Sequence, residues 1–378
     1  MSSTSSVAKL RSRLRLRSRI KQLPEWFASL RKAEAQDREM LIRPGQQKTG
    51  GILIVSHAEK QCGIHEYGLN IAAALEKSSR YSFAYAECSN EKELRRAVKQ
   101  IKPSAIIYNY YPATMPWLTS QMVRRYKVAS LGIMHEVTQE EADRATREMF
   151  DYHLGPDPTL VENNPILFKT RRLIPTYHSR PPVPDVVTIG SFGFGFGGKG
   201  FEHLIETVHR EFDEARIALH LPFNGVVSSQ LQERAMASIK KSAERISKPG
   251  IKLVITRDFL SKSQLLDFLA SNTLNAFFYD TGKHLGISSA IEHALAVRRP
   301  MAITKCGMFR HVFSAYPSIC IEDSSLSRII ENGVTPLEPF YEEWSEANFI
   351  LDYERILDEV FERESKTTSA RKVRLALT

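Results

Sequence analysis

The segment DVVTIGSFGFGFGGKGFEHLIETVHR, residues 185–210, decides the fold class of this chain. Residues 185–192 form an apolar, β-branched run that predicts a buried strand, and residues 201–210 have the apolar spacing of a helix. The loop between them contains Gly193, Gly195, Gly198 and Lys199. Glycines let the backbone approach a ligand closely, and the N–H groups that begin a helix attract anions. With the charge of Lys199 beside them, the loop predicts a diphosphate site.

The same alternation of strand and helix extends on both sides of this segment. Upstream, strands are expected at 51–57, 82–89, 105–111 and 128–135, with helices at 72–75 and 91–101. Downstream, strands are expected at 216–223, 250–259, 274–280 and 299–305, with helices at 230–245, at 263–270 and from Ser288. Strands that alternate with amphipathic helices indicate parallel sheets wrapped by crossover helices. The fold class is therefore α/β, with two Rossmann-like, doubly wound parallel-sheet domains that face a cleft.

A proline-rich stretch divides the two halves, because residues 171–185 hold four prolines and predict an extended linker. Four segments follow from these patterns. They are a basic arm at 1–48, an N-terminal domain at 49–178, a C-terminal domain at 185–340, and a C-terminal helix and tail at 341–378 that packs back across the linker.

Composition narrows the class of protein. The chain has 378 residues, 42% apolar and 25% charged, which is typical of a globular protein of about two domains. The four cysteines are scattered, so they predict a reduced compartment and neither a disulfide framework nor a zinc site. No apolar run reaches the length of a membrane span. The chain also has no Asp-x-Asp pair, so no metal site is expected.

A second glycine loop follows the strand expected at 274–280. Gly286 lies in this loop, and Ser288 or Ser289 is expected to cap the next helix, with the backbone amides facing an anion. Glu292 comes one turn into that helix. A carboxylate there can accept hydrogen bonds from both hydroxyls of a vicinal diol. The loop therefore predicts a site for the phosphates and ribose of a nucleotide.

The first glycine loop leaves an alternative open. Gly193, Gly195 and Gly198 satisfy G-x-G-x-x-G, the fingerprint of dinucleotide binding. The strand expected at 216–223 ends in Leu-Pro-Phe, where that fingerprint needs an acidic residue for the ribose. An NAD-dependent oxidoreductase is thus the less favoured reading.

Four segments together resemble the GT-B glycosyltransferases, in particular the retaining, nucleotide-sugar-dependent family called glycosyltransferase family 4. CGIHEYGLNIAAAL (62–75) is similar to the opening loop and first helix of that family, and the strand that ends in His135 to the one that supplies an acceptor-side histidine. DVVTIGSFGFGFGGKGFEHLIE (185–206) and LSKSQLLDFLASNTLNAFFYDTGKHLGISSAIEHALAVRRPMAIT (260–304) resemble the two donor-binding stretches.

The resemblance implies the activity of a hexosyltransferase in glycan biosynthesis, which moves a sugar from a nucleoside diphosphate sugar with retention, without metal or cofactor. It assigns His135 and His284 to catalysis. Donor and nucleotide binding fall to Gly63, Gly193, Lys199, Gly286, Ser288, Ser289 and Glu292.

One position departs from that family's pattern. Two glutamates separated by seven residues are usual there, and His284 stands at the first while Glu292 stands at the second. The resemblance makes the first glutamate the contact to the donor sugar and the second the contact to the ribose. A binding protein without catalytic activity, on the same fold, is therefore a second hypothesis.

The basicity of the chain is concentrated in the arm. Residues 1–48 hold twelve Lys and Arg against four Asp and Glu, a surplus of eight out of the net charge of +9. Apolar residues at helical spacing among these charges predict that residues 7–31 lie on an anionic membrane surface, while a solvated arm and an organellar transit peptide stay open. The expected location is the cytoplasm, peripheral to the inner face of a membrane. No specific nucleic acid is expected as a partner. The acceptor is unidentified: a lipid-linked glycan, another sugar or a protein.

Overall fold

A computed structural model describes residues 51–59, 62–195, 197–223, 229–282 and 286–376. The basic arm at 1–48 lies outside these residues, and so does His284. The expected roles of the arm and of His284 therefore stay predictions.

The first domain is built on a six-stranded parallel sheet with the strand order β2-β1-β3-β4-β5-β6. Its strands are β1 (Gly51–Ser56), β2 (Ser82–Glu87), β3 (Ala105–Tyr108), β4 (Ala129–Ile133), β5 (Tyr152–Gly155) and β6 (Leu167–Lys169). Its helices are α2 (Gly63–Leu75), α3 (Glu91–Ile101), α4 (Ser120–Arg124) and α5 (Gln139–Asp143). The two short strands β5 and β6 were not predicted from the sequence.

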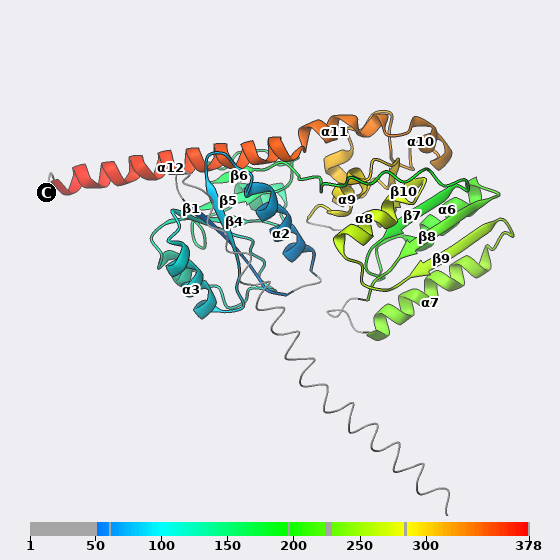
Figure 1. The fold of residues 1–378 in the computed structure, drawn as a ribbon, viewed down its shortest axis with the longest axis horizontal. Coiled ribbons are helices and arrows are strands. Elements are labelled where there is room, and N and C mark those ends of the chain that lie inside the picture. Colours follow the sequence, from blue (N-terminus) through cyan, green and yellow to red (C-terminus); the bar gives the residue numbers. More distant parts are fainter. Residues whose placement is uncertain (1–50, 60–61, 196, 224–228, 283–285, 377–378) are drawn as a thin grey trace, which may run out of the picture.

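The second domain has a five-stranded parallel sheet with the order β11-β10-β7-β8-β9. Its strands are β7 (Thr188–Phe192), β8 (Ala215–His220), β9 (Ile251–Thr256), β10 (Leu274–Phe277) and β11 (Met301–Ile303). Its α-helices are α6 (Phe201–Glu211), α7 (Ser229–Arg245), α8 (Lys262–Ala270), α9 (Ala290–Ala296), α10 (Leu326–Asn332) and α11 (Glu338–Glu343), joined by the 3-10 turns η1 (Gly307–Val312) and η2 (Thr335–Leu337). The two domains lie side by side (Figure 1). The prediction of two parallel α/β domains is confirmed.

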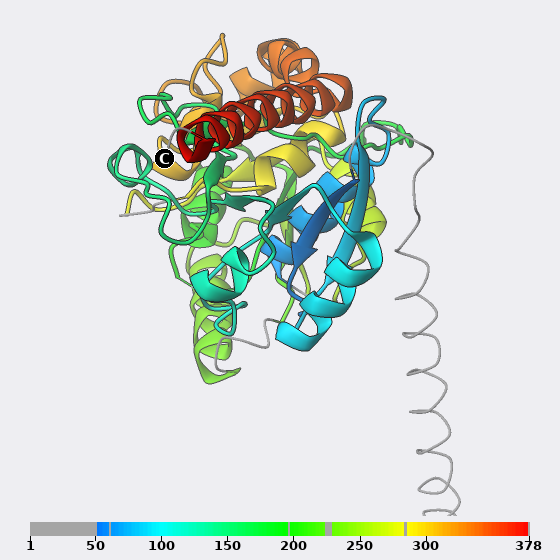
Figure 2. The same ribbon diagram turned by 90° about the vertical axis from the view of Figure 1, so that its left-hand side faces the viewer.

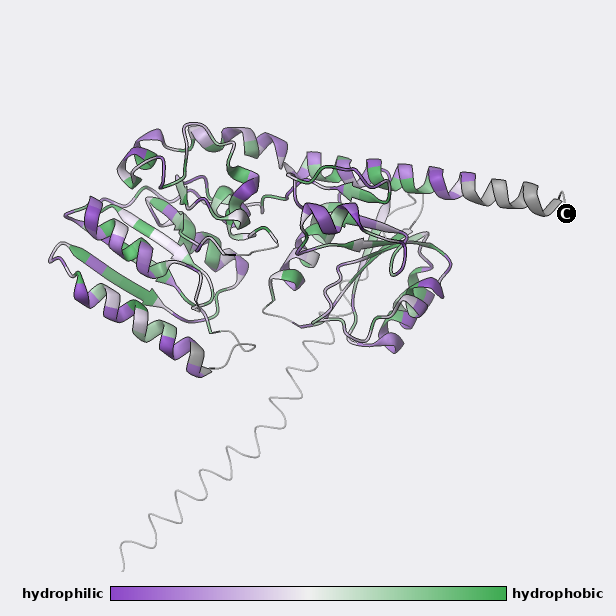
Figure 3. Ribbon diagram, turned by 180° about the vertical axis from the view of Figure 1, so that it is seen from behind, coloured by the Kyte–Doolittle hydropathy of each residue, from purple (hydrophilic) through white to green (hydrophobic). Residues whose placement is uncertain are grey.

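Local sequence accounts for these elements. The central strands β1, β3 and β4 are buried almost throughout, as expected for strands covered on both faces. Asn90 caps α3, and Ser261 begins α8 with a capping box. Figure 3 shows the result: apolar strands run through the interior, and polar residues cover the outer faces of the helices.

The last helix, α12 (Glu346–Ala376), ties the two domains together. Trp344, just before it, belongs to the apolar core of the second domain, whereas Phe349 and Tyr353 pack into the core of the first. The buried Glu354 accepts hydrogen bonds from the Ser78 hydroxyl at 2.6 Å and from two backbone amides after it. In Figures 1 and 2, α12 runs along one side of the molecule and past the first domain.

The carboxyl ends of the two sheets face one another. A Cβ built on Gly286, which follows β10, would lie 3.0 Å from the carbonyl oxygen of His135, which follows β4. The Lys262 Nζ at the start of α8 donates to Asn70 Oδ1 of α2 at 2.5 Å. Ligands of open α/β sheets bind at this edge of the strands. Among the helices of the described residues, none has the length and apolarity that crossing a membrane requires.

Candidate functional site

The predicted diphosphate loop places Lys199 over an aromatic ring. Its Nζ lies 3.8 Å from the centroid of the Tyr279 ring, just past the end of β10. A cation over a ring face is attracted by the ring quadrupole. Gly193 has φ of +153°, and a Cβ there would lie within 4.0 Å of both Lys199 and Tyr279. Gly193, Lys199 and Tyr279 therefore meet at the carboxyl edge of the second sheet.

Gly200 fixes the start of α6 beside Lys199. It has φ of +62°, a left-handed conformation that favours glycine. A Cβ at this position would lie 1.7 Å from the carbonyl oxygen of Phe278. The backbone of the loop is therefore held against the end of β10, and this contact fixes the backbone position from which the Lys199 side chain extends.

The second glycine loop differs in part from the prediction. The Ser288 amide donates to the carbonyl of Met308 at 2.9 Å, so this amide is not available to an anion. Ser289 takes the N-cap position of α9 without a side-chain hydrogen bond, and the Ser288 hydroxyl accepts from the Ala290 amide at 3.3 Å. This one amide is thus engaged by η1, and the prediction that the amides at the start of α9 face an anion stays a prediction for the others.

Glu292 has a partner that the sequence did not predict. Both of its carboxylate oxygens accept hydrogen bonds from the guanidinium of Arg172, at 2.7 and 2.8 Å. Arg172 follows β6 in the first domain, and both residues are buried. Burial alone raises the pKa of Glu292, but the charge and hydrogen bonds of Arg172 outweigh it and lower the pKa to about 2.

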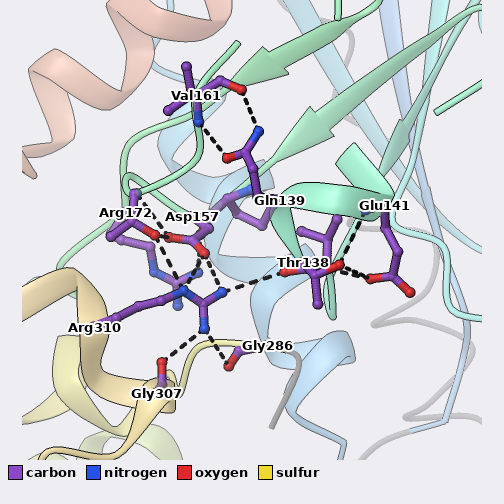
Figure 4. Close-up of polar contacts among 12 residues, drawn as sticks. Thr138, Gln139, Glu141, Asp157, Val161, Arg172, Gly286, Gly307 and Arg310 are labelled. Atoms are coloured by element: carbon purple, nitrogen blue, oxygen red, sulfur yellow. Dashed lines mark hydrogen bonds and ion pairs between the residues drawn. The ribbon is translucent and has the colours of Figure 1, made fainter. Parts of the chain in front are cut away.

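A second ion pair crosses between the domains in the opposite direction. Arg310 of η1 donates to the buried Asp157, which follows β5, and its Nε–Oδ2 distance is 3.0 Å (Figure 4). Its Nη1 donates to the carbonyls of Gly307 at 2.9 Å and Gly286 at 3.4 Å. Each domain thus contributes one arginine and one carboxylate to the contact, and the Gly286 loop lies between the pairs.

His135 lies on the first-domain side of this contact. Its Nε2–H donates to Asn109 Oδ1 at 2.7 Å, and the Asn109 Nδ2 in turn donates to the Ser56 hydroxyl. Because Oδ1 only accepts, the proton of the neutral ring is on Nε2. Burial lowers the pKa of His135 to about 3, and Arg172 and His57 act in the same direction. His135 is therefore neutral at physiological pH, and its Nδ1 is a hydrogen-bond acceptor.

The remaining first-domain residues surround His135. Gly63 begins α2 at the same edge, exposed, and a Cβ there would meet nothing within 4 Å. The expected role of Gly63 in donor binding stays a prediction. His65 Nε2 hydrogen-bonds to Glu87 Oε1 at 2.8 Å, and the His57 and His65 rings lie 5.8 Å apart. Burial lowers the pKa of His57.

Two of the predicted residues, His135 and Gly286, meet where the domains touch, and Glu292 pairs with Arg172 across the same contact. Lys199 lies over the Tyr279 ring, which packs on Phe309 of η1 with the ring centroids 4.7 Å apart. That these residues share one donor stays a prediction. Within the described ranges, no group of three or more His, Cys, Asp or Glu side chains could hold a metal ion.

The sequence did not indicate Arg172, Arg310 or Asp157, although these residues make the buried contact between the domains. The sequence has two adjacent arginines, Arg171 and Arg172, in the proline-rich linker after β6, and because arginine is rarely buried nothing in the sequence singles out Arg172. Only the fold shows which carboxylate it meets.

Comparison with known proteins establishes the fold. No protein-family profile matches the chain, and no curated protein matches its sequence. Sucrose-phosphate synthase from Thermosynechococcus elongatus is similar in structure, with a TM-score of 0.61 and 9% identity over 84% of this chain and 100% of that one. Anabaena HepE in complex with UDP has a TM-score of 0.57 and 12% identity, over 83% and 100% of the chains.

A third similar structure is the UDP-forming α,α-trehalose-phosphate synthase from Burkholderia xenovorans in complex with glucose-6-phosphate. Its TM-score is 0.53 at 8% identity, over 83% of this chain and 99% of that one. The two parallel-sheet domains and these similarities together show that the fold of this chain is that of the GT-B glycosyltransferases.

Proposed function

We propose that this protein transfers a sugar from a nucleoside diphosphate sugar to a hydroxyl group of an acceptor. The observation that carries the proposal is the placement of Lys199 and His135 on the two facing sheet edges of a GT-B fold. The similar structures support it, because one is a complex with UDP and two are sugar-phosphate synthases. Membership of glycosyltransferase family 4 is part of the proposal and rests on the resemblance of the sequence.

Lys199 supplies positive charge for the leaving group. In the transfer, the bond between the anomeric carbon and the diphosphate oxygen breaks, and negative charge develops on the diphosphate. A fixed cation at that point stabilises the transition state by several kcal/mol and needs no metal ion. Tyr279 holds the ammonium in place through the contact at 3.8 Å.

His135 orients a hydroxyl of the donor sugar in this proposal. Its neutral ring donates through Nε2 to Asn109, so Nδ1 is left to accept a hydrogen bond from a sugar hydroxyl. With retention, the acceptor hydroxyl attacks on the face that the diphosphate leaves. Its proton then passes to the departing phosphate oxygen, and a new bond joins the acceptor oxygen to the anomeric carbon.

The nucleotide end of the donor falls to Glu292 and the Gly286 loop. Two carboxylate oxygens at the first turn of α9 match the vicinal hydroxyls of a ribose. Gly286 approaches the first domain closely, so a diphosphate beside Lys199 would place the donor sugar between the two domains.

The arm supports a proposal for the acceptor and the location. Residues 7–31 carry the basic, amphipathic pattern that is typical of a segment on an anionic membrane surface. We therefore favour a lipid-linked glycan as the acceptor, and we propose that the protein is peripheral to the inner face of a membrane.

The test is an assay of nucleoside diphosphate release with UDP-glucose, UDP-galactose, UDP-N-acetylglucosamine and GDP-mannose. Release from at least one donor, by hydrolysis or by transfer, is the expected result. Thermal stabilisation by a nucleotide without any release would instead show a binding protein without catalytic activity. Stabilisation by NAD alone would support the oxidoreductase alternative and contradict the proposal.

A further inference from the structure

The pairing of Glu292 with Arg172 is unusually complete. The Arg172 Nε donates to Glu292 Oε1 at 2.7 Å, and the Arg172 Nη2 donates to Glu292 Oε2 at 2.8 Å. Two such hydrogen bonds fix the orientation of the carboxylate relative to the guanidinium. The side chains are 6% and 4% exposed, so little of the pair faces solvent. The carboxylate that the proposed function assigns to the ribose is therefore held from the first domain.

Arg172 is itself fixed on the first-domain side. Its third donor, Nη1, reaches the carbonyl oxygen of Pro156 at 2.8 Å. The guanidinium also lies 5.9 Å from the centroid of the Tyr67 ring of α2. Since Arg172 lies in the linker, just after β6, the orientation of Glu292 depends on the segment that joins the two domains.

The carboxylate keeps part of its hydrogen-bonding capacity. An ionised carboxylate has about four acceptor positions, and Arg172 uses two of them. His311 Nε2 lies 3.5 Å from Oε1, and the His311 ring stacks on Trp344 at 5.6 Å. With His311 beside one of them, the positions that Arg172 leaves are the ones that the proposed function gives to the ribose hydroxyls.

The charged and titratable groups around Glu292 come from several elements. They are Arg172 beside the linker, His311 of η1, Tyr67 of α2, His293 of α9 itself, and Asp157 on the far side of Arg172. Burial lowers the pKa of His311 and that of His293. Arg172 is therefore the cation among these groups that keeps Glu292 ionised in a buried place.

We propose that Arg172 is a positioning residue for the donor nucleotide, which holds Glu292 as a carboxylate in one orientation for the ribose hydroxyls. This inference rests on the proposed function. Because Arg172 belongs to the first domain, the ribose end of the site is complete only when the two domains are docked.

The test compares the dissociation constants of UDP and 2′-deoxy-UDP by calorimetry, on the full chain, between pH 5.5 and 8. The wild-type protein is expected to prefer UDP by tenfold or more, at every pH in this range. In Arg172→Met the preference is expected to fall below threefold at pH 5.5, because the unpaired, buried Glu292 becomes protonated. It recovers as the pH rises and the carboxyl ionises.

Arg172→Lys distinguishes the effect of the positive charge from the effect of the guanidinium geometry. It is also the variant to test if Arg172→Met does not fold. Lysine keeps the positive charge but lacks the two-pronged geometry. Its preference for UDP is expected to fall by threefold or more without any pH dependence. Arg171→Met is the matched control, because Arg171 pairs with Asp352 of α12, and its preference is expected to equal that of the wild type.

Arg310→Met is the control for domain docking. It removes the other ion pair between the domains without touching Glu292, so the preference for the 2′-hydroxyl is expected to persist.

Three results would overturn the inference. One is that both Arg172 variants prefer UDP over 2′-deoxy-UDP as strongly as the wild type does. Another is tighter UDP binding by Arg172→Met, which would mean that Arg172 competes with the ribose for Glu292. The third is an equal loss in Arg310→Met, which would assign the effect to docking. A wild-type protein that binds no nucleoside diphosphate contradicts the proposed function, and the inference falls with it.

Discussion

Replacing Lys199 by methionine tests the proposed diphosphate site with little change in packing. Methionine keeps an unbranched, apolar stem against the Tyr279 ring, so the variant removes the charge and leaves the loop in place. Gly193 and Gly200, which set the backbone on either side, are unchanged. The fold is therefore expected to survive, and a thermal unfolding curve checks this.

The magnitude follows from the contact that would be lost. A hydrogen bond between a charged donor and a phosphate contributes about 1.5–3 kcal/mol. At about 1.4 kcal/mol per tenfold change, the dissociation constant of UDP should rise about 12-fold to 140-fold. Its dependence on ionic strength should weaken as well, because one cation no longer faces the phosphates.

Isothermal titration calorimetry with UDP at two salt concentrations is the assay. Lys248→Met is the matched control, because Lys248 pairs with Asp213 at 3.2 Å and precedes β9, at the edge opposite to Lys199. The reasoning is refuted if Lys199→Met binds UDP within twofold of the wild type while remaining folded.

Three further predictions concern the loop, His135 and the arm. Gly200→Ala should lower the free energy of unfolding by about 2–5 kcal/mol, because of the left-handed backbone and the clash with Phe278. Gly197→Ala, which has open space around its Cβ, should change the free energy of unfolding by less than 1 kcal/mol. Equal urea midpoints for the two variants would contradict this prediction. The pKa of His135 is 6.5 in the unfolded chain and about 3 in the folded protein, so the unfolded state takes up this proton at the higher pH. The free energy of unfolding therefore decreases as the pH drops below 6.5, by about 1.4 kcal/mol per pH unit. In His135→Gln, the free energy of unfolding measured with urea should depend less steeply on pH between 4 and 6.5, by that slope, and an unchanged slope would count against it. Changing three arginines within residues 7–31 to glutamine should weaken sedimentation with vesicles rich in phosphatidylserine by about 1 kcal/mol per charge, and undiminished sedimentation would remove the arm from the membrane.

The sheets could be predicted because their strands are buried on both faces. Runs such as residues 51–57 and 274–280 are apolar almost throughout, which distinguishes them from the amphipathic helices between them. The strands β5 and β6 were missed although β10 and β11 are equally short. β10 and β11 lie inside longer apolar runs, whereas β5 and β6 flank the segment 156–165, whose Pro, Asp and Asn residues are typical of a loop.

Several predicted strands were too long at their carboxyl ends, and the reason is physical. The strands β1, β4 and β10 end at Ser56, Ile133 and Phe277, before His57, His135 and Tyr279. These three residues are apolar or aromatic enough to continue a strand pattern, but they leave the sheet. They lie at the edge where ligands bind in this fold.

The site could be predicted only as far as local patterns reach. Glycine loops and a lysine at a helix start are local features, so Gly193 and Lys199 could be identified. The pairs Arg172–Glu292 and Arg310–Asp157 join residues 120 and 153 positions apart, and no local signal connects them. For the same reason, no local pattern indicated that the Ser288 amide donates to Met308 of η1.

A crystal structure of the full chain with UDP would show where the nucleotide binds. We expect the diphosphate within hydrogen-bonding distance of the Lys199 Nζ, between the loops that contain Gly193 and Gly286, with the ribose toward Glu292. UDP bound elsewhere, or bound with Lys199 pointing away from the phosphates, would contradict it.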